Sequence, residues 1–277
     1  MDTPGTGFRR RTLLKSSALA VLLALGTGVT TAQETTAAAT YVPTVLITGA
    51  NRGIGLEVAR QYAARGWHVI GTARKPAEAT ELNALAAASD GKVLVEALDV
   101  MDLAAIDALA TKYQGKPVDI LFNNAGVTGG GENQQFAKNM KWDLFDVVFR
   151  TNVVGPLKMA EAFLPNVQAS ELKKISNVSS SQGSIGSTRT GTLYIYRSSK
   201  ASLNMVMVNL ANQLKSKGIA VALIDPGPVD TDMMKSLPKK MLRPVTTAGS
   251  DLIRITDQLT LQNTGTYWTF DGTVLPW

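Results

Sequence analysis

From Val42 onward the chain alternates short apolar runs with longer amphipathic stretches, and this alternation restricts the possible folds more than any other feature. The short runs are mostly β-branched and apolar at every position, which is typical of strands covered on both faces. They lie at residues 45–47, 69–70, 93–95, 120–122, 175–178 and 220–224. The stretches between them, such as 56–65, 77–88 and 103–113, have helical length and composition. The pattern predicts an α/β fold, a doubly wound parallel sheet of about seven strands with helices on both faces.

The composition excludes several other classes of protein. With 277 residues, 45% of them hydrophobic and 18% charged, the chain has ordinary globular usage, which argues against disorder, collagen-like repeats and coiled coils. It has no Cys, so a disulfide framework, a cysteine zinc site and a thiol nucleophile are excluded. His68 is the single histidine and lies away from every motif, so no metal site is expected. No internal repeat interrupts the later part of the chain, which we interpret as one domain.

The first 32 residues are predicted to be an export signal. A basic segment that ends at Lys15 precedes the apolar run 18–25, which is far shorter than the roughly 20 residues of a membrane-spanning helix. Small residues at 30–32 offer a cleavage site, followed by a Thr- and Ala-rich linker over 33–42. No membrane span is therefore expected in the mature protein. The segment Arg10-Arg11-Thr12-Leu13-Leu14-Lys15 resembles the twin-arginine export motif, which implies the bacterial periplasm. An ordinary secretory signal, an uncleaved anchor and a wrongly assigned start codon remain alternatives, and an unused signal would leave the protein in the cytoplasm.

The same N-terminal segment carries four basic residues and one acidic residue. Its net charge of +3 is half of the formal net charge of +6 of the whole chain. The remaining positive charge is small and scattered along the chain. Nucleic-acid binding proteins usually carry a basic stripe or an aromatic platform. Because neither is present, no nucleic-acid partner is expected.

A glycine-rich loop, Thr48-Gly49-Ala50-Asn51-Arg52-Gly53-Ile54-Gly55, directly follows the first predicted strand and opens into the helix 56–65. Glycines there allow a sharp turn and a close approach of the backbone to a pyrophosphate. The helix N-terminus adds free N–H groups and a positive dipole. A glycine-rich turn alone is weak evidence, but its place between the first strand and the first helix indicates a dinucleotide site.

The glycine spacing G-x-x-x-G-x-G resembles the fingerprint of the short-chain dehydrogenase/reductase family. Three further motifs of that family follow in order: Asn123-Asn124-Ala125-Gly126, the Y-x-x-x-K pattern of Tyr196-Arg197-Ser198-Ser199-Lys200, and Pro226-Gly227 after the sixth strand. The resemblance covers roughly residues 43–275 and implies a single-domain Rossmann fold over residues 43–277. The positions that it assigns to cofactor binding are Gly49, Asn51, Arg52, Gly53, Ile54, Gly55, Arg74, Asp99, Val100, Asn124, Ala125, Gly126, Tyr196, Lys200, Pro226, Gly227, Val229 and Thr231.

The end of the second strand favours NADP(H) over NAD(H) as the cofactor. NAD-binding proteins usually carry an acid about 20 residues after the glycine loop, to hold the ribose hydroxyls. Here the strand ends in Arg74-Lys75, with no acid before Glu78. Arg74 and Arg52 can instead hold a 2′-phosphate through charge-assisted hydrogen bonds. NAD(H) remains the alternative, because either arginine alone can be an ordinary surface residue.

The family resemblance implies a catalytic tetrad of Asn152, Ser180, Tyr196 and Lys200. Tyr196 and Lys200 are four residues apart and therefore share one face of a helix. The ammonium is expected to lower the pKa of the phenol, which protonates the carbonyl oxygen during reduction. Ser180 would hydrogen-bond that oxygen, and Asn152 would position a water beside Lys200. Ser180 rather than its neighbours is chosen because successive strand residues face opposite ways, although its spacing to Tyr196 is longer than usual in the family.

Within the family, the chain looks like the Sniffer/C-signal-like carbonyl reductases, because of its Y-I-Y-R-S-S-K segment and its ending F-D-G-T-V-L-P-W. We therefore predict an NADP(H)-dependent oxidoreductase that reduces a ketone or an aldehyde. A non-catalytic NADP(H)-binding or signalling protein of the same fold is the alternative. Met- and Leu-rich residues 233–242 are interpreted as either a substrate lid or simple packing. A homodimer or homotetramer is expected, since two family helices, around 151–164 and 198–214, carry extra apolar residues.

Overall fold

The computed structural model describes residues 41–130 and 135–277. The predicted signal (1–32) and nearly all of the predicted linker (33–42) lie outside these ranges. The end of the linker is anchored to the domain, since the phenol of Tyr41 donates hydrogen bonds of 2.7 Å to both carboxylate oxygens of Asp119. The backbone N–H of Thr44, at the start of the first strand, donates to the same carboxylate at 2.8 Å.

Seven parallel strands form one sheet in the order β3-β2-β1-β4-β5-β6-β7. Their bounds are β1 Thr44–Ile47, β2 His68–Ala73, β3 Val93–Ala97, β4 Ile120–Asn123, β5 Lys174–Val178, β6 Ala220–Asp225 and β7 Tyr267–Thr269. The strand order reverses direction at β1 and β4, which is where a doubly wound sheet opens a crevice at the carboxyl ends of its strands. The predicted α/β fold is confirmed.

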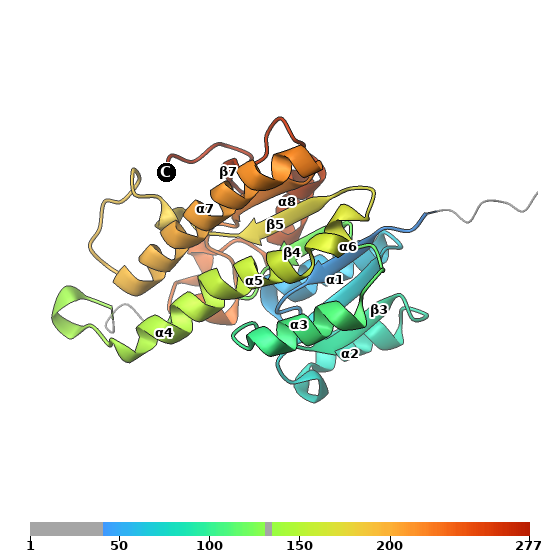
Figure 1. Cartoon of the computed structure of the whole chain (residues 1–277). Coiled ribbons are helices and arrows are strands. Elements are labelled where there is room, and N and C mark those ends of the chain that lie inside the picture. Colours follow the sequence, from blue (N-terminus) through green and yellow to red (C-terminus); the bar gives the residue numbers. More distant parts are fainter. Residues whose placement is uncertain (1–40, 131–134) are drawn as a thin grey trace, which may run out of the picture. The chain divides into compact units, whose positions relative to one another are not determined.

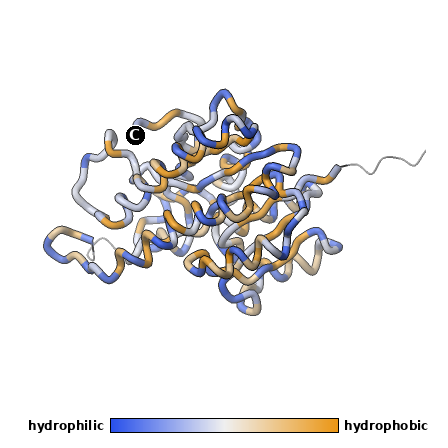
Figure 2. The backbone as a smooth tube through the Cα atoms, viewed as in Figure 1, coloured by the Kyte–Doolittle hydropathy of each residue, from blue (hydrophilic) through white to orange (hydrophobic). Residues whose placement is uncertain are grey.

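Helices cover both faces of this sheet (Figure 1). One face is covered by α1 (Gly53–Ala64), α2 (Thr80–Ala87) and α8 (Val245–Asp257). The opposite face is covered by α3 (Leu103–Lys112), α5 (Gly155–Ala162) and α7 (Tyr194–Leu214). Two short helices complete the set, α4 (Asp143–Phe149) before α5 and α6 (Leu164–Gln168) after it. Apolar and polar residues alternate along the helices in Figure 2, as expected for helices with one face on a sheet.

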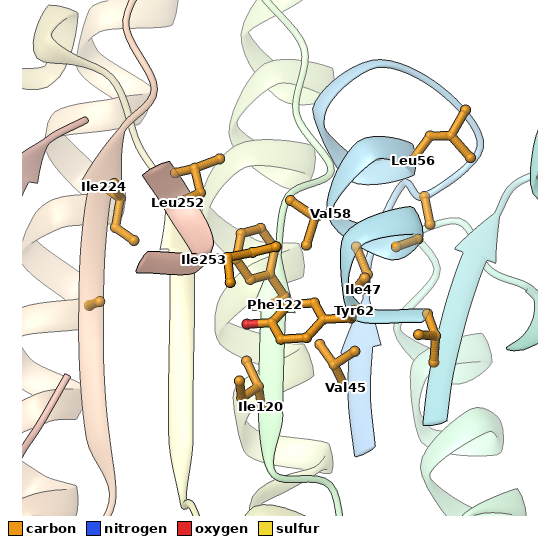
Figure 3. Packing of buried hydrophobic residues seen from close by; sticks show 14 of the residues in the cluster. Val45, Ile47, Leu56, Val58, Tyr62, Ile120, Phe122, Ile224, Leu252 and Ile253 are labelled. Atoms are coloured by element: carbon orange, nitrogen blue, oxygen red, sulfur yellow. The ribbon is translucent and has the colours of Figure 1, made fainter. Parts of the chain in front are cut away.

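The core consists of two apolar layers, one on each face of the sheet. Figure 3 shows the layer under α1 and α8, in which Tyr62 of α1 and Ile253 of α8 pack over Phe122 of β4. In β1, Val45 and Ile47 belong to this layer, whereas Leu46 belongs to the layer under α3, α5 and α7. Val45 to Ile47 of β1, all of β4 and all of β6 are buried, which is consistent with the mostly apolar sequences of these strands.

No helix in residues 41–130 or 135–277 combines the length and the apolar character needed to cross a bilayer.

Candidate active site

The glycine loop connects β1 to α1 in a conformation that depends on its glycines. Gly49 and Gly53 have φ values of +67° and +55°, in the left-handed region that favours glycine. A Cβ on Gly55 would lie only 2.4 Å from both the Asn124 Nδ2 atom and the Gly49 carbonyl oxygen. The loop is therefore packed too tightly for a side chain at this position.

This loop fits a bound dinucleotide. Helix α1 begins at Gly53, and no side chain caps its first N–H groups, since the preceding residue, Arg52, makes no capping hydrogen bond. Uncapped amides at a helix N-terminus attract a phosphate. Asn51 and Ile54 lie in the same turn and are half-buried. The residues present therefore suit the pyrophosphate of a nicotinamide dinucleotide.

The two arginines predicted to select the cofactor have different surroundings. Arg52 is paired with Asp232, with 3.1 Å between its Nη1 atom and the carboxylate. Arg74 is exposed directly after β2, where the following Lys75 pairs with Glu78 at 2.9 Å. The end of β2 contacts the glycine loop, because the Ala50 N–H donates to the Thr72 carbonyl at 2.8 Å.

Asp99 and Val100 follow β3 and lie at the same end of the sheet. Asp99 is half-buried, and its carboxylate accepts the N–H of Met101 at 3.0 Å. Val100 is buried against Gly155 at the start of α5, where an added Cβ would come within 2.9 Å of the Val100 carbonyl oxygen. Both of these predicted cofactor-binding residues thus lie on a loop that packs against a neighbouring helix.

Asn124, Ala125 and Gly126 follow β4, and the first two are hydrogen-bonded to the glycine loop. The Thr48 hydroxyl accepts the N–H groups of Asn124 and Ala125, both at 3.0 Å. The Asn124 amide in turn donates to the carbonyls of Thr48 and Gly49, at 2.9 and 3.0 Å. Thr48, which the sequence did not assign a role, therefore connects the ends of β1 and β4.

Asn152 lies in a π-helical turn, Arg150–Val154, that joins α4 to α5. π-Helical turns are rare and often occur at functional sites. The buried Asn152 side chain accepts the N–H of Val127 at 2.9 Å and donates to its carbonyl at 2.8 Å. It also donates to the Ser199 hydroxyl at 3.0 Å. This side chain fixes the segment after Gly126, and its predicted role in holding a water stays a prediction.

The three consecutive serines after β5 face different partners. Ser179 is buried and donates to the Asn204 side chain at 2.6 Å. Ser180 is half-buried, and its hydroxyl accepts the N–H of Gln182 at 3.3 Å. Burial raises the pKa of the Asp225 carboxyl group, and hydrogen bonds from Ser181 oppose this shift. Of the three, Ser180 is the one that acts on the Tyr196 phenol: burial raises the pKa of this phenol, and the Ser180 side chain opposes the shift.

Tyr196 and Lys200 lie one turn apart on α7, and both are buried. The Lys200 ammonium donates to the Val178 carbonyl at 2.8 Å and lies 5.9 Å from the centre of the Tyr196 ring. A Cβ on Gly126 would lie 3.4 Å from Asn152 Oδ1 and 3.8 Å from Lys200 Nζ. The fold therefore gathers all four predicted catalytic residues around the ends of β4 and β5.

Burial controls the titration of this pair. It raises the pKa of Tyr196 to about 12, an effect that the Ser180 hydrogen bond opposes and the charge of Asp225 reinforces. Burial also lowers the pKa of Lys200 to about 8, against the influence of Asp225. The sequence led us to expect that Lys200 lowers the pKa of the phenol. Burial outweighs any such effect, and the pKa of the phenol is raised.

The segment after β6 returns to the glycine loop. Gly227 has a φ of +70°, and a Cβ there would lie 2.9 Å from the Phe270 ring, while Pro226 and the buried Val229 flank it. Thr231 contacts the start of α1, because its Cγ2 atom would lie 3.2 Å from a Cβ on Gly53. The predicted contacts of this segment thus lie next to the glycine loop.

Sequence reasoning missed three residues that support the site. Asp225, the last residue of β6, is 5% exposed, and burial raises its pKa. Arg243 donates to the Pro226 carbonyl and to the Asp251 carboxylate, with its guanidinium 3.6 Å from the centre of the Phe270 ring. The Tyr267 hydroxyl donates to the Ser180 carbonyl. None belongs to a sequence motif, although the charge of Asp225 directly after the predicted strand 220–224 was a visible signal.

A pocket of about 560 Å³ lies between the loop Gln182–Thr192 and one face of α7. Tyr194, Arg197, Ser198 and Ala201 line it, and none of the four predicted catalytic residues does. The extra residues between Ser180 and Tyr196 therefore form the wall of a separate pocket. Within the part of the chain that the structure describes, no group of three or more His, Cys, Asp or Glu side chains is placed to hold a metal ion.

Comparisons with known proteins agree with this arrangement. The model of the short chain dehydrogenase family matches residues 43–242. The chain is 34% identical over 238 residues to 1-hydroxy-2-glutathionyl-2-methyl-3-butene dehydrogenase of Rhodococcus sp. (strain AD45), covering 84% of this chain and 99% of that protein. It is also 34% identical over 172 residues to C-signal of Myxococcus xanthus, covering 61% of this chain and 99% of that protein.

The chain is also similar to solved structures of carbonyl reductases. The NADPH-bound carbonyl reductase from chicken fatty liver is 30% identical, with a TM-score of 0.78 over 85% of this chain and 99% of that one. The carbonyl reductase Sniffer of D. melanogaster is 28% identical, with a TM-score of 0.76 over 86% of this chain and 100% of that one. Since the family model covers most of the chain and the relatives are covered nearly end to end, the chain belongs to the short chain dehydrogenase family.

Proposed function

We propose that the protein is an NADP(H)-dependent carbonyl reductase that converts a ketone or an aldehyde to an alcohol. One observation carries the proposal: Ser180, Tyr196 and Lys200 converge at the carboxyl ends of the strands, beside a glycine loop that fits a dinucleotide. The similarity to two carbonyl reductases, one of them bound to NADPH, supports the same activity.

In the proposed reaction, Tyr196 donates its phenolic proton to the carbonyl oxygen of the substrate. Burial raises the pKa of Tyr196 to about 12, so the phenol is protonated at neutral pH and is ready to act as an acid. Ser180 donates a hydrogen bond to the same oxygen as negative charge develops there. NADPH, when bound, supplies the hydride that adds to the carbonyl carbon. Lys200 provides a buried positive charge one turn from Tyr196.

The choice of NADP(H) over NAD(H) rests on the basic residues at the adenosine end of the site. Arg74 is exposed at the end of β2, and no acid precedes Glu78 there. Arg52, in the glycine loop, is also exposed, and its pairing with Asp232 is a surface ion pair of the kind worth little energy. A 2′-phosphate, which carries more charge than one carboxylate, can therefore recruit both guanidinium groups.

The substrate is proposed to be small to medium in size and fairly apolar. Residues Met233, Leu237 and Met241, on the segment after Thr231, keep large apolar side chains exposed to solvent. Flexible thioethers can adapt to apolar ligands of different shapes. An exposed apolar rim beside the Pro226-Gly227 segment suits a substrate that covers it on binding.

The decisive experiment measures turnover of a panel of ketones and aldehydes with NADPH and purified protein. Replacing Tyr196 with Phe should reduce turnover by roughly 10²–10⁴-fold, because the proton donor is lost. NADPH binding, followed by fluorescence titration, should be retained. Tyr194→Phe is the matched control, since this exposed tyrosine lies two residues earlier on α7 and should keep full activity. Full activity in Tyr196→Phe would refute the mechanism.

A non-catalytic NADP(H)-binding or signalling role is the second candidate. The similarity to C-signal of Myxococcus xanthus favours it. The same panel separates the two candidates, because tight NADPH binding without turnover of any carbonyl would support the binding role.

We propose a homodimer or homotetramer that pairs through α5 and α7, where Leu157 and Met205 are large, apolar and exposed. Light scattering at micromolar concentration should give a multiple of the chain mass, and a monomer would contradict this.

We also propose that residues 1–32 direct export by the twin-arginine route.

A further inference from the structure

Helix α7 carries Tyr196 close to its N-terminus, and this end has no cap of its own. The first N–H groups of a helix lack partners inside the helix, and a Ser, Thr, Asp or Asn just before it usually accepts one of them. Here the preceding residue is Leu193, which has no polar side chain and a φ of +54°. Tyr196 is the third residue of the helix, the position whose N–H a capping side chain normally binds.

Gln135 provides the missing cap from a distant part of the chain. Its Oε1 atom accepts the backbone N–H of Tyr196 at 2.9 Å, although the two residues are 61 positions apart. Its Nε2 atom donates to the Thr128 carbonyl at 2.7 Å. Its own carbonyl accepts the Tyr194 N–H at 3.4 Å. With an exposed fraction of 0%, the Gln135 side chain cannot exchange these partners for water.

The carbonyl of Tyr196 is connected to the same loop by a second route. The Ser199 hydroxyl donates to the Tyr196 carbonyl at 2.7 Å and accepts the Asn152 amide at 3.0 Å. Asn152 in turn holds the backbone of Val127, the neighbour of Thr128. Both polar backbone groups of Tyr196 are thereby linked to Val127 and Thr128, directly after the predicted cofactor residue Gly126.

We propose that Gln135 is a positioning residue, which caps α7 and holds the Tyr196 phenol at its working distance from Ser180 and the substrate. The proposal rests on the proposed function, in which Tyr196 is the proton donor. Gln135 itself touches neither substrate nor cofactor. It acts through the backbone of Tyr196, so its loss displaces the phenol without removing any reacting group.

The consequence of losing Gln135 follows from its burial. Without this side chain the Tyr196 N–H would be buried without a partner, which is costly enough to loosen the first turn of the helix. Proton transfer depends steeply on the placement of the donor, and misplacement by about 1 Å can cost 10²-fold in rate. Binding of the dinucleotide depends on the glycine loop, which Gln135 does not contact, so it should change little.

The first arm of the test compares wild type with Gln135→Met, which has similar length but no hydrogen-bonding amide. Hydrogen exchange should be faster at the amides of Tyr194 to Tyr196, while kcat should fall by roughly ten- to a hundredfold. The affinity for NADPH should stay within about twofold, because the contacts predicted in the glycine loop and at Arg74 are left in place. Asn166→Leu is the matched control. Its buried amide likewise bridges two carbonyls, of Tyr113 and Lys116, but these precede the start of β4, whereas the proposed site lies at the carboxyl ends of the strands, so this variant should keep wild-type kcat.

The second arm places Gln135→Met in a Tyr196→Phe background. If Gln135 acts through Tyr196, it should cost little further activity there, since the group that it positions is already absent. Equal losses in both backgrounds would overturn the proposal, as would unchanged exchange at Tyr196 in the single variant. Gln135→Asn, which is too short to reach both partners, should reproduce the loss of kcat if Gln135→Met fails to fold. The exchange measurement does not use activity, so the cap can be tested even if the proposed function fails.

Discussion

Asp225 is buried beside Tyr196 and Lys200, and its charge opposes the ionisation that alcohol oxidation requires. Burial and the Asp225 carboxylate both raise the pKa of Tyr196, whereas at Lys200 burial lowers the pKa and Asp225 opposes that larger effect. The pKa of Tyr196 is raised to about 12, so its protonated form, the acid for carbonyl reduction, persists through neutral pH. Alcohol oxidation needs the phenolate and should therefore increase with pH. For the proposed reaction, the raised pKa of Tyr196 therefore favours reduction near neutral pH.

Asp225→Asn should move the pH dependence of alcohol oxidation to lower pH. The amide removes a negative charge, so the pKa of Tyr196 falls and the phenolate forms earlier as pH rises. The measurement is kcat/KM for oxidation across pH 6 to 11, with reduction as the companion reaction. Asp257→Asn, at an exposed carboxylate paired with Arg65, should leave the profile unchanged. A midpoint that stays fixed or rises in Asp225→Asn would show that Asp225 does not act on Tyr196.

Arg74→Asp should shift cofactor preference from NADPH toward NADH. The change removes a partner of the 2′-phosphate and supplies an acceptor for the ribose hydroxyls. The ratio of kcat/KM for NADPH to that for NADH should fall by at least about tenfold, the equivalent of one charge-assisted hydrogen bond. A smaller effect is expected at Arg52, which Asp232 already engages. Lys75→Ala, at the neighbouring basic residue, is the control, and an unmoved ratio in Arg74→Asp would exclude Arg74 as the selector.

At the scale of residues, the sequence predicted those site positions that belong to ordered motifs. Ser180 could be chosen among three serines because alternation along a strand separates its direction from that of Ser179, which binds Asn204. Gln135 and Arg243 could not be found, because they act through contacts with segments far away in the chain. The raised pKa of Tyr196 could not be predicted either, since it depends on how deeply the phenol is buried.

At the scale of elements, the predicted helices are present, but the residues at which they begin differ from the prediction, for physical reasons. The helix expected from residue 56 begins at Gly53, where the glycine loop turns directly into α1. The helix expected over 77–88 is a 3₁₀ turn at Pro76–Glu78 followed by α2 from Thr80, with Pro at the first position of the turn. The π-helical turn that holds Asn152 between α4 and α5 leaves no periodic signal in the sequence.

Gly55→Ala should disrupt the connection between the glycine loop and the end of β4. The added methyl group would overlap the Asn124 amide and the Gly49 carbonyl, so the hydrogen bonds that join these segments must move. We expect a lower melting temperature, by thermal unfolding, and at least about tenfold weaker NADPH binding, since the phosphate cradle is distorted. Gly191→Ala is the control, because its nearest neighbour, the Tyr194 hydroxyl, would lie 3.6 Å away. Unchanged stability and binding in Gly55→Ala would mean that the loop adapts.

At the scale of the whole molecule, the site is a consequence of topology. Residues separated by up to 180 positions, such as Arg52 and Asp232, meet because parallel strands end at the same side of the sheet. The chain order of the motifs could therefore predict which residues converge. The distances could not be predicted, because they depend on loops such as Val127 to Gly130 and the residues after Gln135, whose packing has no periodic pattern.

At the scale of the whole protein, we expect export to depend on Arg10 and Arg11. Twin-arginine systems move folded proteins, so an enzyme with this signal should fold and bind NADP(H) before it crosses the membrane. The cofactor loop from Gly49 to Gly55 follows the signal closely, and it is complete only when β1, α1 and β4 have assembled. Replacing Arg10 and Arg11 with Lys should retain the protein in the cytoplasm with its fold and activity intact, as measured by fractionation and by the carbonyl assay. Normal export of the Lys pair, or wild-type protein found only in the cytoplasm with residues 1–32 attached, would exclude this route.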